Sequence, residues 1–544
     1  MGAPPSARAP GVLLSLHRGA APLFVATALL YFVLGYWLNV HLSLVDNDGP
    51  SRVANAGYIL FSRDPHVAAV GFVWNPLPSF LEVPLLLLRH LWPALQTKAI
   101  AGIIESSLFM AGSVCLVAGI ARDRGMSAWT RWLLVAVFAC NPMIIEYAGN
   151  GLSEASFVFF TLWATRRLLQ WIEDDRTIHL VVCGVALGLA YLTRYEAIVS
   201  GLSAGIAVAL QSLLGRSASG GRDLWAVAAH RVVLLLFPLG VTFAVWSLTS
   251  WLLTGDALAQ FQSQYGNSAQ LSVFRAGAAP HPVATALRSV VAIEPLLPLL
   301  IVVGVAVALR ARESMLLAAG PAAGILAFEM YGAISGSTAA WFRFYLMSVP
   351  LVVTVIAAIA GSPSTRDASA QRWRGGLALA SSVAALLTSL PATWTAMLDP
   401  LIGNQPQQYA LGYLTHDPPD PALAPFYDVN TAQDELAAYL DRLHLPEGSV
   451  LLDPFFGNQI WLASLNDKQF VVASDYDFLH ALNDPSGSGI QYILAPNPEG
   501  EGSLNEVNKR YPTFWSDGAG IATPLVTFSG GPGQTEWRIY RVIR

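Results

Sequence analysis

Residues 343–361, RFYLMSVPLVVTVIAAIAG, contain a single charged side chain, at their first position. A helix of about 20 such residues is long enough to cross the roughly 30 Å of hydrocarbon in a bilayer. Because a lipid-exposed backbone must satisfy its own hydrogen bonds, the stretch is predicted to be a transmembrane helix. Similar runs recur along most of the chain. The predicted spans are 21–40, 98–120, 129–148, 151–170, 178–194, 197–214, 229–252, 285–309, 314–333, 343–361 and 373–397.

The composition favours the same fold class. The 544 residues are 54% hydrophobic and 12% charged, and the polar residues are concentrated in a few loops and the last quarter of the chain. We therefore predict a polytopic α-helical membrane protein with about eleven transmembrane helices, an interfacial helix and a C-terminal soluble α/β domain. The predicted domains are a cytoplasmic N-terminus (1–20), a transmembrane domain (21–397) with a catalytic first outer loop (41–97), a linker (398–430) and an extracytoplasmic α/β domain (431–544).

The arginines predict the orientation, since basic residues favour the cytoplasmic side of a membrane. If the N-terminus is cytoplasmic, the opposite short loops hold little beyond Arg194, Arg275 and Arg343. The C-terminal domain is then outside the cell membrane. The arginines of the cytoplasmic loops would be Arg8, Arg18, Arg122, Arg124, Arg166, Arg167, Arg176, Arg216, Arg222, Arg310, Arg312, Arg366, Arg372 and Arg374.

One apolar stretch, residues 76–95, does not fit this pattern as a span. It carries Pro78, Glu82 and Arg89, and counting it as a full span would place the later basic loops outside. We therefore predict that it is a helix lying in the outer membrane interface.

The C-terminal region has a different character from the rest of the chain. Residues 401–544 contain 17 Asp and Glu against 7 Lys and Arg, a net charge of −10, which is unsuited to nucleic acid or anionic lipid. Residues 431–444 have helical spacing, and short apolar runs between them and the C-terminus are typical of strands. We expect this domain to shape recognition of an acceptor without supplying catalytic groups. The predicted strands are 449–452, 469–473, 491–495, 524–528 and 537–542.

The first outer loop contains the strongest candidate for chemistry, the sequence Asp46-Asn47-Asp48-Gly49-Pro50 followed by Arg52. Two carboxylates two residues apart, just past the end of a span, are costly to leave unpaired near the low dielectric of the membrane. They could accept a proton from a hydroxyl or hold a divalent cation, and Arg52 could pair with an anionic substrate. The alternative is a simple helix-ending turn, since Asn, Asp, Gly and Pro favour turns.

Three further outer turns carry charge. Glu154 follows Asn150-Gly-Leu-Ser, Arg194 and Glu196 flank Tyr195, and Arg343 begins an aromatic segment. Each has a structural alternative: a helix N-terminal charge for Glu154, a local ion pair for Arg194 and Glu196, and interfacial anchoring for Arg343. Together they place acidic and basic groups on one face, as needed to bind a lipid phosphate and activate a hydroxyl.

These motifs resemble those of the GT-C superfamily of membrane glycosyltransferases. The acidic first outer loop, Trp74-Asn75-Pro-Leu-Pro, Asn150-Gly-Leu-Ser-Glu and Leu192-Thr-Arg-Tyr-Glu are most similar to members related to protein O-mannosyltransferases and aminoarabinose transferases. The Trp-Asn-Pro-Leu-Pro element departs from the His-Pro-Pro pattern of better-known members. The resemblance implies a polyprenyl-phosphate sugar donor and a base in the first outer loop.

By that resemblance, Asp46 or Asp48 would be the base, and Arg194 or Arg343 would bind the donor phosphate. The other candidate substrate-binding residues are Arg52, Trp74, Asn75, Glu154, Tyr195 and Glu196. The predicted function is an inverting glycosyltransferase that moves a sugar from the lipid donor to a hydroxyl of a protein, lipid or glycan acceptor. A membrane transporter or lipid flippase, and a noncatalytic scaffold with an outer binding domain, remain as alternatives.

Overall fold

The computed structural model describes residues 20–42, 45–214, 224–262, 282–338, 340–361, 368–415, 430–530 and 535–543. Most of the predicted cytoplasmic N-terminus (1–20) and part of the predicted linker (398–430) lie outside these ranges. So do six of the arginines used to predict the orientation, namely Arg8, Arg18, Arg216, Arg222, Arg275 and Arg366.

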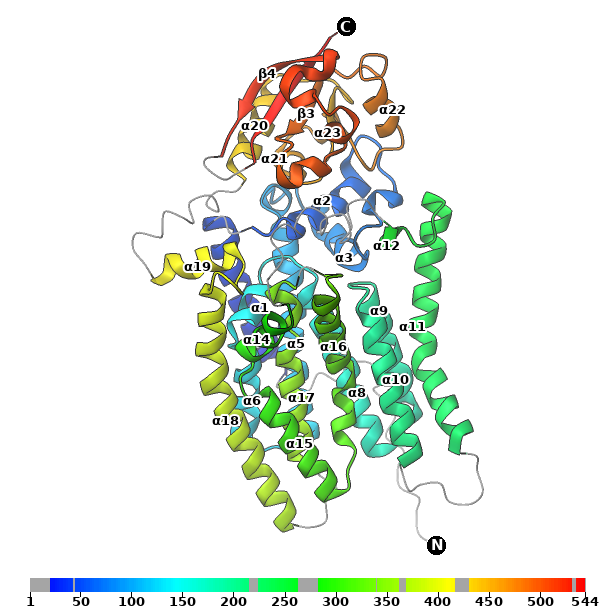
Figure 1. The fold of residues 1–544 in the computed structure, drawn as a ribbon, viewed down its shortest axis with the longest axis vertical. Helices are drawn as coiled ribbons and strands as arrows, with labels where there is room; N and C mark the ends of the chain where they lie inside the picture. Colours follow the sequence, from blue (N-terminus) through cyan, green and yellow to red (C-terminus); the bar gives the residue numbers. More distant parts are fainter. Residues whose placement is uncertain are drawn as a thin grey trace.

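Long, roughly parallel helices form one end of the molecule, and a smaller unit containing a sheet forms the other (Figure 1). Apolar side chains buried between the long helices make up the largest hydrophobic core. The main helices of the bundle are α1 (Ala20–Tyr36), α5 (Ile100–Asp123), α6 (Ala128–Ala139), α7 (Pro142–Tyr147), α8 (Glu154–Asp174), α9 (Thr177–Tyr191), α10 (Ala197–Leu214), α11 (Leu224–Thr254), α14 (Pro282–Ile293), α15 (Leu297–Ala311), α16 (Gly320–Ser335), α17 (Ser348–Ala360) and α18 (Ala368–Leu398).

Seven helical stretches within the described ranges are long and apolar enough to cross a membrane, or eight if the bent pair α14–α15 counts as one span. The chain is therefore a multi-pass membrane protein, but the predicted count of eleven is not confirmed. The shortfall has visible causes. The span predicted at 129–148 is broken between α6 and α7 at Pro142, and α9 has only 15 residues.

The stretch 343–361 forms the short helix η5 (Phe342–Tyr345) and α17. Nearly all of its side chains are buried inside the bundle, from Phe342 at 3% exposure to Ile359 at 0%. A helix that is apolar on all sides is typical of a position surrounded by other helices. Protein rather than lipid therefore covers most of this span, and Arg343 at its start lies inside the structure.

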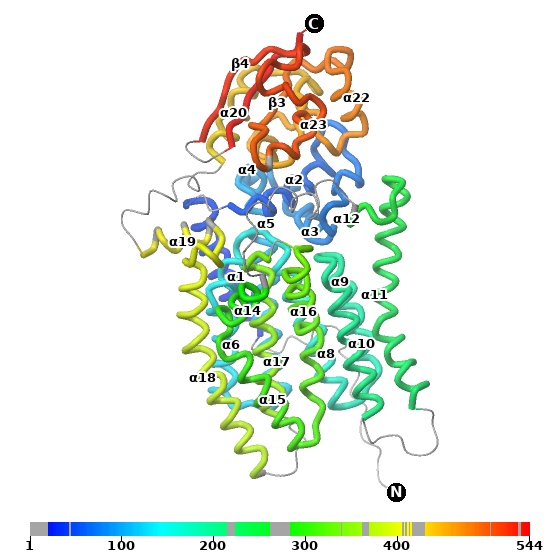
Figure 2. The backbone as a smooth tube through the Cα atoms, viewed as in Figure 1, coloured from blue at the N-terminus to red at the C-terminus, as the bar shows by residue number. Residues whose placement is uncertain are grey.

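The first outer loop folds into short helices between the bundle and the C-terminal unit (Figure 2). These are η1 (Trp37–His41), α2 (Asp48–Phe61), η2 (Val67–Val70), α3 (Leu77–Leu86) and α4 (Ala94–Thr97). The predicted interfacial helix corresponds to α3, whose 10 residues are about half the number needed to span a bilayer. Residues 76–95 therefore do not form a transmembrane helix.

The C-terminal unit contains a five-stranded sheet with strand order β2-β1-β3-β5-β4. Strand β1 is parallel to β2 and β3, whereas β5 is antiparallel to β3 and β4. All five predicted strand regions contain a strand. The main elements of the C-terminal unit are α20 (Thr431–Arg442), β1 (Val450–Leu452), α21 (Asn458–Ala463), β2 (Phe470–Val472), α22 (Phe478–Asn483), β3 (Tyr492–Pro496), α23 (Glu506–Arg510), α24 (Phe514–Asp517), β4 (Ala522–Phe528) and β5 (Trp537–Val542).

The sheet unit and the first outer loop share one hydrophobic core. Val53 and Tyr58 of α2 belong to the same buried cluster as Leu436 and Trp461 of the C-terminal unit. The rings of Tyr58 and Trp461 meet edge to face with their centroids 4.7 Å apart. Helix α2 is therefore held from the outer side at its C-terminal half, while its first residue, Asp48, faces the bundle.

Ion pairs add to this attachment. Arg89 pairs with Asp467 at 2.6 Å, and Lys98 pairs with Asp434 at 2.8 Å. Both cations come from the outer loop or its end, and both acids come from the C-terminal unit. The unit therefore rests on the loop through charged as well as apolar contacts.

Candidate functional site

The turn that carries Asp46 and Asp48 is tied together by its own backbone. The amide of Gly49 donates to the carbonyl of Asp46 at 3.0 Å, and the amide of Asp48 donates to Asp46 Oδ1 at 3.3 Å. The turn expected as the structural alternative is therefore present, and it presents two carboxylates at the same time. The turn and the chemical hypothesis are compatible.

Arg343 joins these two carboxylates across 295 residues of sequence or more. Its Nη1 lies 3.0 Å from Asp46 Oδ2 and its Nη2 lies 2.7 Å from Asp48 Oδ2. The Arg343 side chain is 8% exposed, whereas those of Asp46 and Asp48 are 27% and 23% exposed. The cation is thus buried behind two acids that a ligand can still reach.

The charge network continues through Glu154. Its Oε1 lies 3.8 Å from Arg343 Nε and 2.6 Å from Arg194 Nη1. Arg194 also contacts Glu196 Oε1, through Nη2 at 2.6 Å and Nε at 3.0 Å. Six residues predicted from four separate segments therefore form one continuous network. Buried charges of this kind are stable only when they are paired, so the loss of one member weakens the rest.

Glu329 of α16 extends the network and was missed by the sequence analysis. It is 3% exposed and interacts electrostatically with Glu196 and Arg194. A signal existed in the sequence, since an acidic residue inside an apolar span is costly and often functional.

The other predicted site residues lie beside this network. Arg52 is 3% exposed, donates from Nη2 to Ser153 Oγ at 3.1 Å and stacks its guanidinium over Trp74 at 5.1 Å. Tyr195 packs against Phe261 with ring centroids 6.0 Å apart. Arg52 and Trp74 therefore pack beside Ser153 and Glu154, and Tyr195 lies at the edge of the charge network.

Asn75 has a positioning contact. Its side-chain amide donates to the carbonyl of Tyr191, and the amide of Leu77 donates to the carbonyl of Leu192 at 2.9 Å. The Trp-Asn-Pro-Leu-Pro element is thereby fixed to the end of α9, just before Arg194. This contact holds the element in place, and binding of a substrate by Asn75 stays a prediction.

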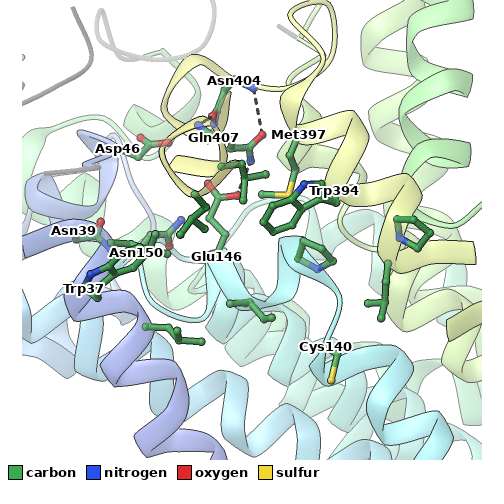
Figure 3. A pocket seen from close by; sticks show the side chains of 18 residues that line it. Trp37, Asn39, Asp46, Cys140, Glu146, Asn150, Trp394, Met397, Asn404 and Gln407 are labelled. Carbon is green, nitrogen blue, oxygen red and sulfur yellow. Dashed lines mark hydrogen bonds between the residues drawn. The ribbon is translucent and has the colours of Figure 1, made fainter. Parts of the chain in front are cut away.

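An apolar cavity of about 460 Å³ opens beside Asp46. It lies between α1, α7, α18 and α19 (Gln405–Thr415), and its walls include Leu34, Trp37, Leu390 and Trp394 (Figure 3). Its polar end is formed by Asp46 together with Asn39, Asn150, Glu146 and Gln407. A long apolar space that ends at charged groups has the chemistry of a site for an amphiphile with a polar head.

Glu146 and Gln407 close the polar end and were not singled out from the sequence. Gln407 Nε2 donates to Glu146 Oε2 at 2.7 Å, and the backbone amide of Gln407 donates to Asn404 Oδ1 at 2.7 Å. The backbone amide of Asn404 in turn donates to Gln407 Oε1 at 3.2 Å (Figure 3). Gln407 belongs to α19, in the stretch predicted as an irregular linker. The sequence offers no clear periodic signal for an 11-residue helix that contains Pro406 and Gly412.

The surroundings of Asp46 tune it as a proton acceptor. Burial raises the pKa of the Asp46 carboxyl to about 6, against the effect of Arg343, and the negative charge of Asp48 raises it further. A general base is most effective when its pKa lies near the working pH. Asp46 therefore combines a suitable pKa with access to the cavity.

A divalent cation at Asp46 and Asp48 was one prediction from the sequence. Within the described ranges, no group of three or more His, Cys, Asp or Glu side chains is arranged to hold a metal ion. In the structure Arg343 contacts both carboxylates. The two carboxylates are thus paired with a guanidinium. The divalent cation stays a prediction, and the proposed reaction assigns no step to it.

No protein-family model and no curated protein sequence matches the chain. Among solved structures, the chain is similar to the oligosaccharyltransferase of Archaeoglobus fulgidus tethered with an acceptor peptide, with a TM-score of 0.43 and 10% identity. It is also similar to AglB from the same organism in complex with an inhibitory peptide and a dolichol-phosphate, with a TM-score of 0.40 and 11% identity. Each alignment covers 96% of this chain and 74% of the other.

These archaeal oligosaccharyltransferases share 10% and 11% sequence identity with the chain. At TM-scores below 0.5 this likeness carries no argument about function. The function proposed next therefore rests on the side chains of this chain.

Proposed function

We propose that this chain is a glycosyltransferase that moves a sugar from a polyprenyl-phosphate donor to an acceptor hydroxyl on the extracytoplasmic face of the membrane. The observation that supports it best is the position of Asp46. This one carboxylate lines the apolar cavity and is also bound to Arg343, so it lies where a lipid tail would end and a charged head would begin.

The apolar cavity accounts for the lipid part of the donor. Leu34 and Leu390, with the rings of Trp37 and Trp394, offer contacts to a hydrocarbon chain. Burial of apolar surface stabilises such a complex by about 25 cal/mol per Å². A polyprenyl chain lying between α1 and α18 would bring its phosphate to the polar end at Asp46.

Arg343 is suited to the phosphate. A guanidinium carries five N–H groups, and its contacts to Asp46 and Asp48 use one N–H of each terminal nitrogen. The remaining N–H groups can donate to phosphate oxygens, with Arg194 as a second cation 2.6 Å from Glu154. Because the leaving phosphate is a stable anion, the reaction requires no general acid.

In the proposed step, the acceptor oxygen forms a bond to the anomeric carbon while the bond from that carbon to the phosphate oxygen breaks. The hydroxyl proton moves to Asp46, and the electron pair of the broken bond leaves with the phosphate, which Arg343 stabilises. Attack from the face opposite the phosphate inverts the anomeric configuration. Asp48 and Glu154 keep Arg343 in place through their contacts with its guanidinium.

The test compares Asp46→Asn with Asp256→Asn in membranes that contain the full chain. Asp256 lies outside the network, in the turn after α11, where its carboxylate accepts from the amide of Leu258 at 2.8 Å. With a panel of polyprenyl-phosphate hexoses and pentoses as donors, Asp46→Asn should lower transfer by about 10²- to 10⁴-fold, the usual contribution of a general base. Asp256→Asn should leave transfer near the wild-type rate.

Cys140 gives a second readout that does not depend on turnover. It lines the apolar cavity and is an exposed free thiol. Polyprenyl phosphate should slow its alkylation by a maleimide in wild type and in Asp46→Asn. Normal transfer by Asp46→Asn would refute the assigned base, and alkylation unaffected by the lipid would refute the assigned donor cavity.

A further inference from the structure

A second, smaller cavity of about 130 Å³ lies next to the donor cavity. Asn39 and Asn150 line both spaces, so these two amides form the partition between them. The second cavity is bounded by Gly49 and Pro50 of the first outer loop and, on its outer side, by the start of α20. It is therefore built jointly by the membrane part and the C-terminal unit.

The lining of this cavity is mostly polar. Lys98 Nζ lies 2.8 Å from Asp434 Oδ2, and Gln459 Nε2 donates to Asp434 Oδ1 at 2.7 Å and to the carbonyl of Thr97 at 3.0 Å. Asn430 and Thr431 add an amide and a hydroxyl. These groups come from several elements and surround the space, so they suit a ligand with several hydroxyl groups.

The side-chain amides of Asn39 and Asn150 have complementary hydrogen-bonding groups left to offer a ligand. Asn39 Nδ2 donates both of its hydrogens, to the carbonyl of Gly35 at 2.9 Å and of Gly149 at 2.7 Å, which leaves Oδ1 as an acceptor. Asn150 Oδ1 accepts from the amide of Leu152 at 3.1 Å, which leaves its N–H groups as donors. A hydroxyl group at the partition can therefore donate to Asn39 and accept from Asn150.

The same turn links the partition to the base. Asp46 lines the donor cavity and Gly49 lines the second cavity, and the two residues are joined by the hydrogen bond from the Gly49 amide to the Asp46 carbonyl. A hydroxyl held at the partition would consequently lie between the base and the donor head. The volume is about ten times the 10–15 Å³ that one water requires, so it accommodates a group of several atoms.

From these observations we propose that the second cavity binds a saccharide unit of the acceptor, and that Thr431 and Asp434 of α20 select it. A serine or threonine side chain presents only one hydroxyl, whereas amide, hydroxyl, ammonium and carboxylate groups from several elements line this cavity. The inference rests on the proposed function, because it assigns the acceptor of that reaction. It gives the C-terminal unit a direct contact with substrate.

The experiment compares neighbouring acids of one helix. Asp434→Asn changes a cavity residue, whereas Glu435→Gln makes the same chemical change at an exposed position of α20. With methyl glycosides and short oligosaccharides as acceptors, Asp434→Asn should raise the acceptor KM about tenfold or more, the size expected for one hydrogen bond to a charged group. The donor KM should stay the same, and Glu435→Gln should behave as wild type.

Thr431→Val serves as the variant that leaves the Lys98–Asp434 ion pair intact, and it should also raise the acceptor KM. A direct readout uses the thiol introduced by Thr431→Cys in a Cys140→Ala background. Methyl glycosides should protect that thiol from a maleimide. Protection without any sugar transfer would keep this site and reject the proposed function.

Three results would overturn the inference. The first is a changed donor KM in Asp434→Asn with an unchanged acceptor KM. The second is wild-type kinetics in both Asp434→Asn and Thr431→Val. The third is efficient transfer to saccharides with no protection of the introduced thiol.

Discussion

The two cavities beside Asp46 differ in size, lining and origin. The larger one, about 460 Å³, lies between α1, α7, α18 and α19 and is mainly apolar. The smaller one, about 130 Å³, includes the outer loop and α20 and is mainly polar. An apolar wall selects for a hydrocarbon chain by burial, and a polar wall selects for hydroxyl groups by unmet hydrogen bonds. The different linings would therefore direct the lipid donor to the larger cavity and the saccharide acceptor to the smaller one, before either substrate reaches Asp46.

The turn that carries Asp46 and Asp48, and the helix α2 that follows it, are attached from both sides. Arg343 holds Asp46 and Asp48 from the bundle, whereas Tyr58 and Trp461 hold α2 from the C-terminal unit. Movement of the outer unit would therefore be transmitted along α2 to Asp48. This arrangement explains how the turn with the proposed base can be both accessible and well positioned.

Removing Arg343, the cation that holds this turn, should have the largest effect among the substitutions that follow. Arg343→Gln leaves two carboxylates without their partner and removes donors from the phosphate, so transfer should fall by about 10²- to 10³-fold. Arg288→Gln is the matched control, because Arg288 also pairs with an aspartate, Asp399 at 2.6 Å, but is 56% exposed. The measurement is the rate of sugar transfer in purified membranes. Equal losses in the two variants would contradict the proposed role of Arg343.

A change confined to the apolar cavity should affect the lipid alone. Trp394 lines that cavity, and Trp373 lies on the same helix, α18, at 40% exposure and outside the cavity. Trp394→Ala should raise the KM for a long-chain donor about tenfold, equivalent to about 1.4 kcal/mol of lost apolar contact. Trp373→Ala should not.

A short-chain donor provides the internal control. It reaches the polar end without filling the apolar cavity, so its KM should be the same in wild type and Trp394→Ala. Equal losses with long and short donors would mean that Trp394 acts on the polar end and not on the lipid tail.

The sequence predicted the charged residues of the site better than it predicted the two cavities or the contacts between those residues. Asp46, Glu154 and Arg194 could be selected because charge at the end of a span is costly wherever it occurs. Which of the predicted residues pair with one another could not be read from the sequence. The contact from Arg343 to Asp48 crosses 295 residues and depends on how the helices pack, which local spacing does not contain.

The fold shows the same division. The five strands were predicted from local apolar runs, but α19 and the shared core of α2 with Trp461 depend on tertiary contacts. The number of transmembrane spans also could not be predicted from the local hydropathy pattern. Hydropathy locates apolar runs, but it does not show that Pro142 breaks one of them into α6 and α7.

The smallest expected effect is a shift in pH dependence, and it separates the two carboxylates of the turn. Asp46 must be deprotonated to accept a proton, and burial raises its pKa to about 6. The kcat/KM of wild type should therefore be level above that pH and fall about tenfold per unit below it. The negative charge of Asp48 contributes to raising this pKa.

Asp48→Asn removes that charge, so the acidic limb should move to lower pH while a measurable rate remains at neutral pH. The profile is recorded with a saturating lipid donor and with Asp256→Asn as the control for the substitution itself, which should keep the wild-type limb. If Asp48 were the base, Asp48→Asn would instead lose activity at every pH. A limb moved to higher pH would show that Asp48 lowers the pKa of Asp46, and the electrostatic assignment of the pair would then be wrong.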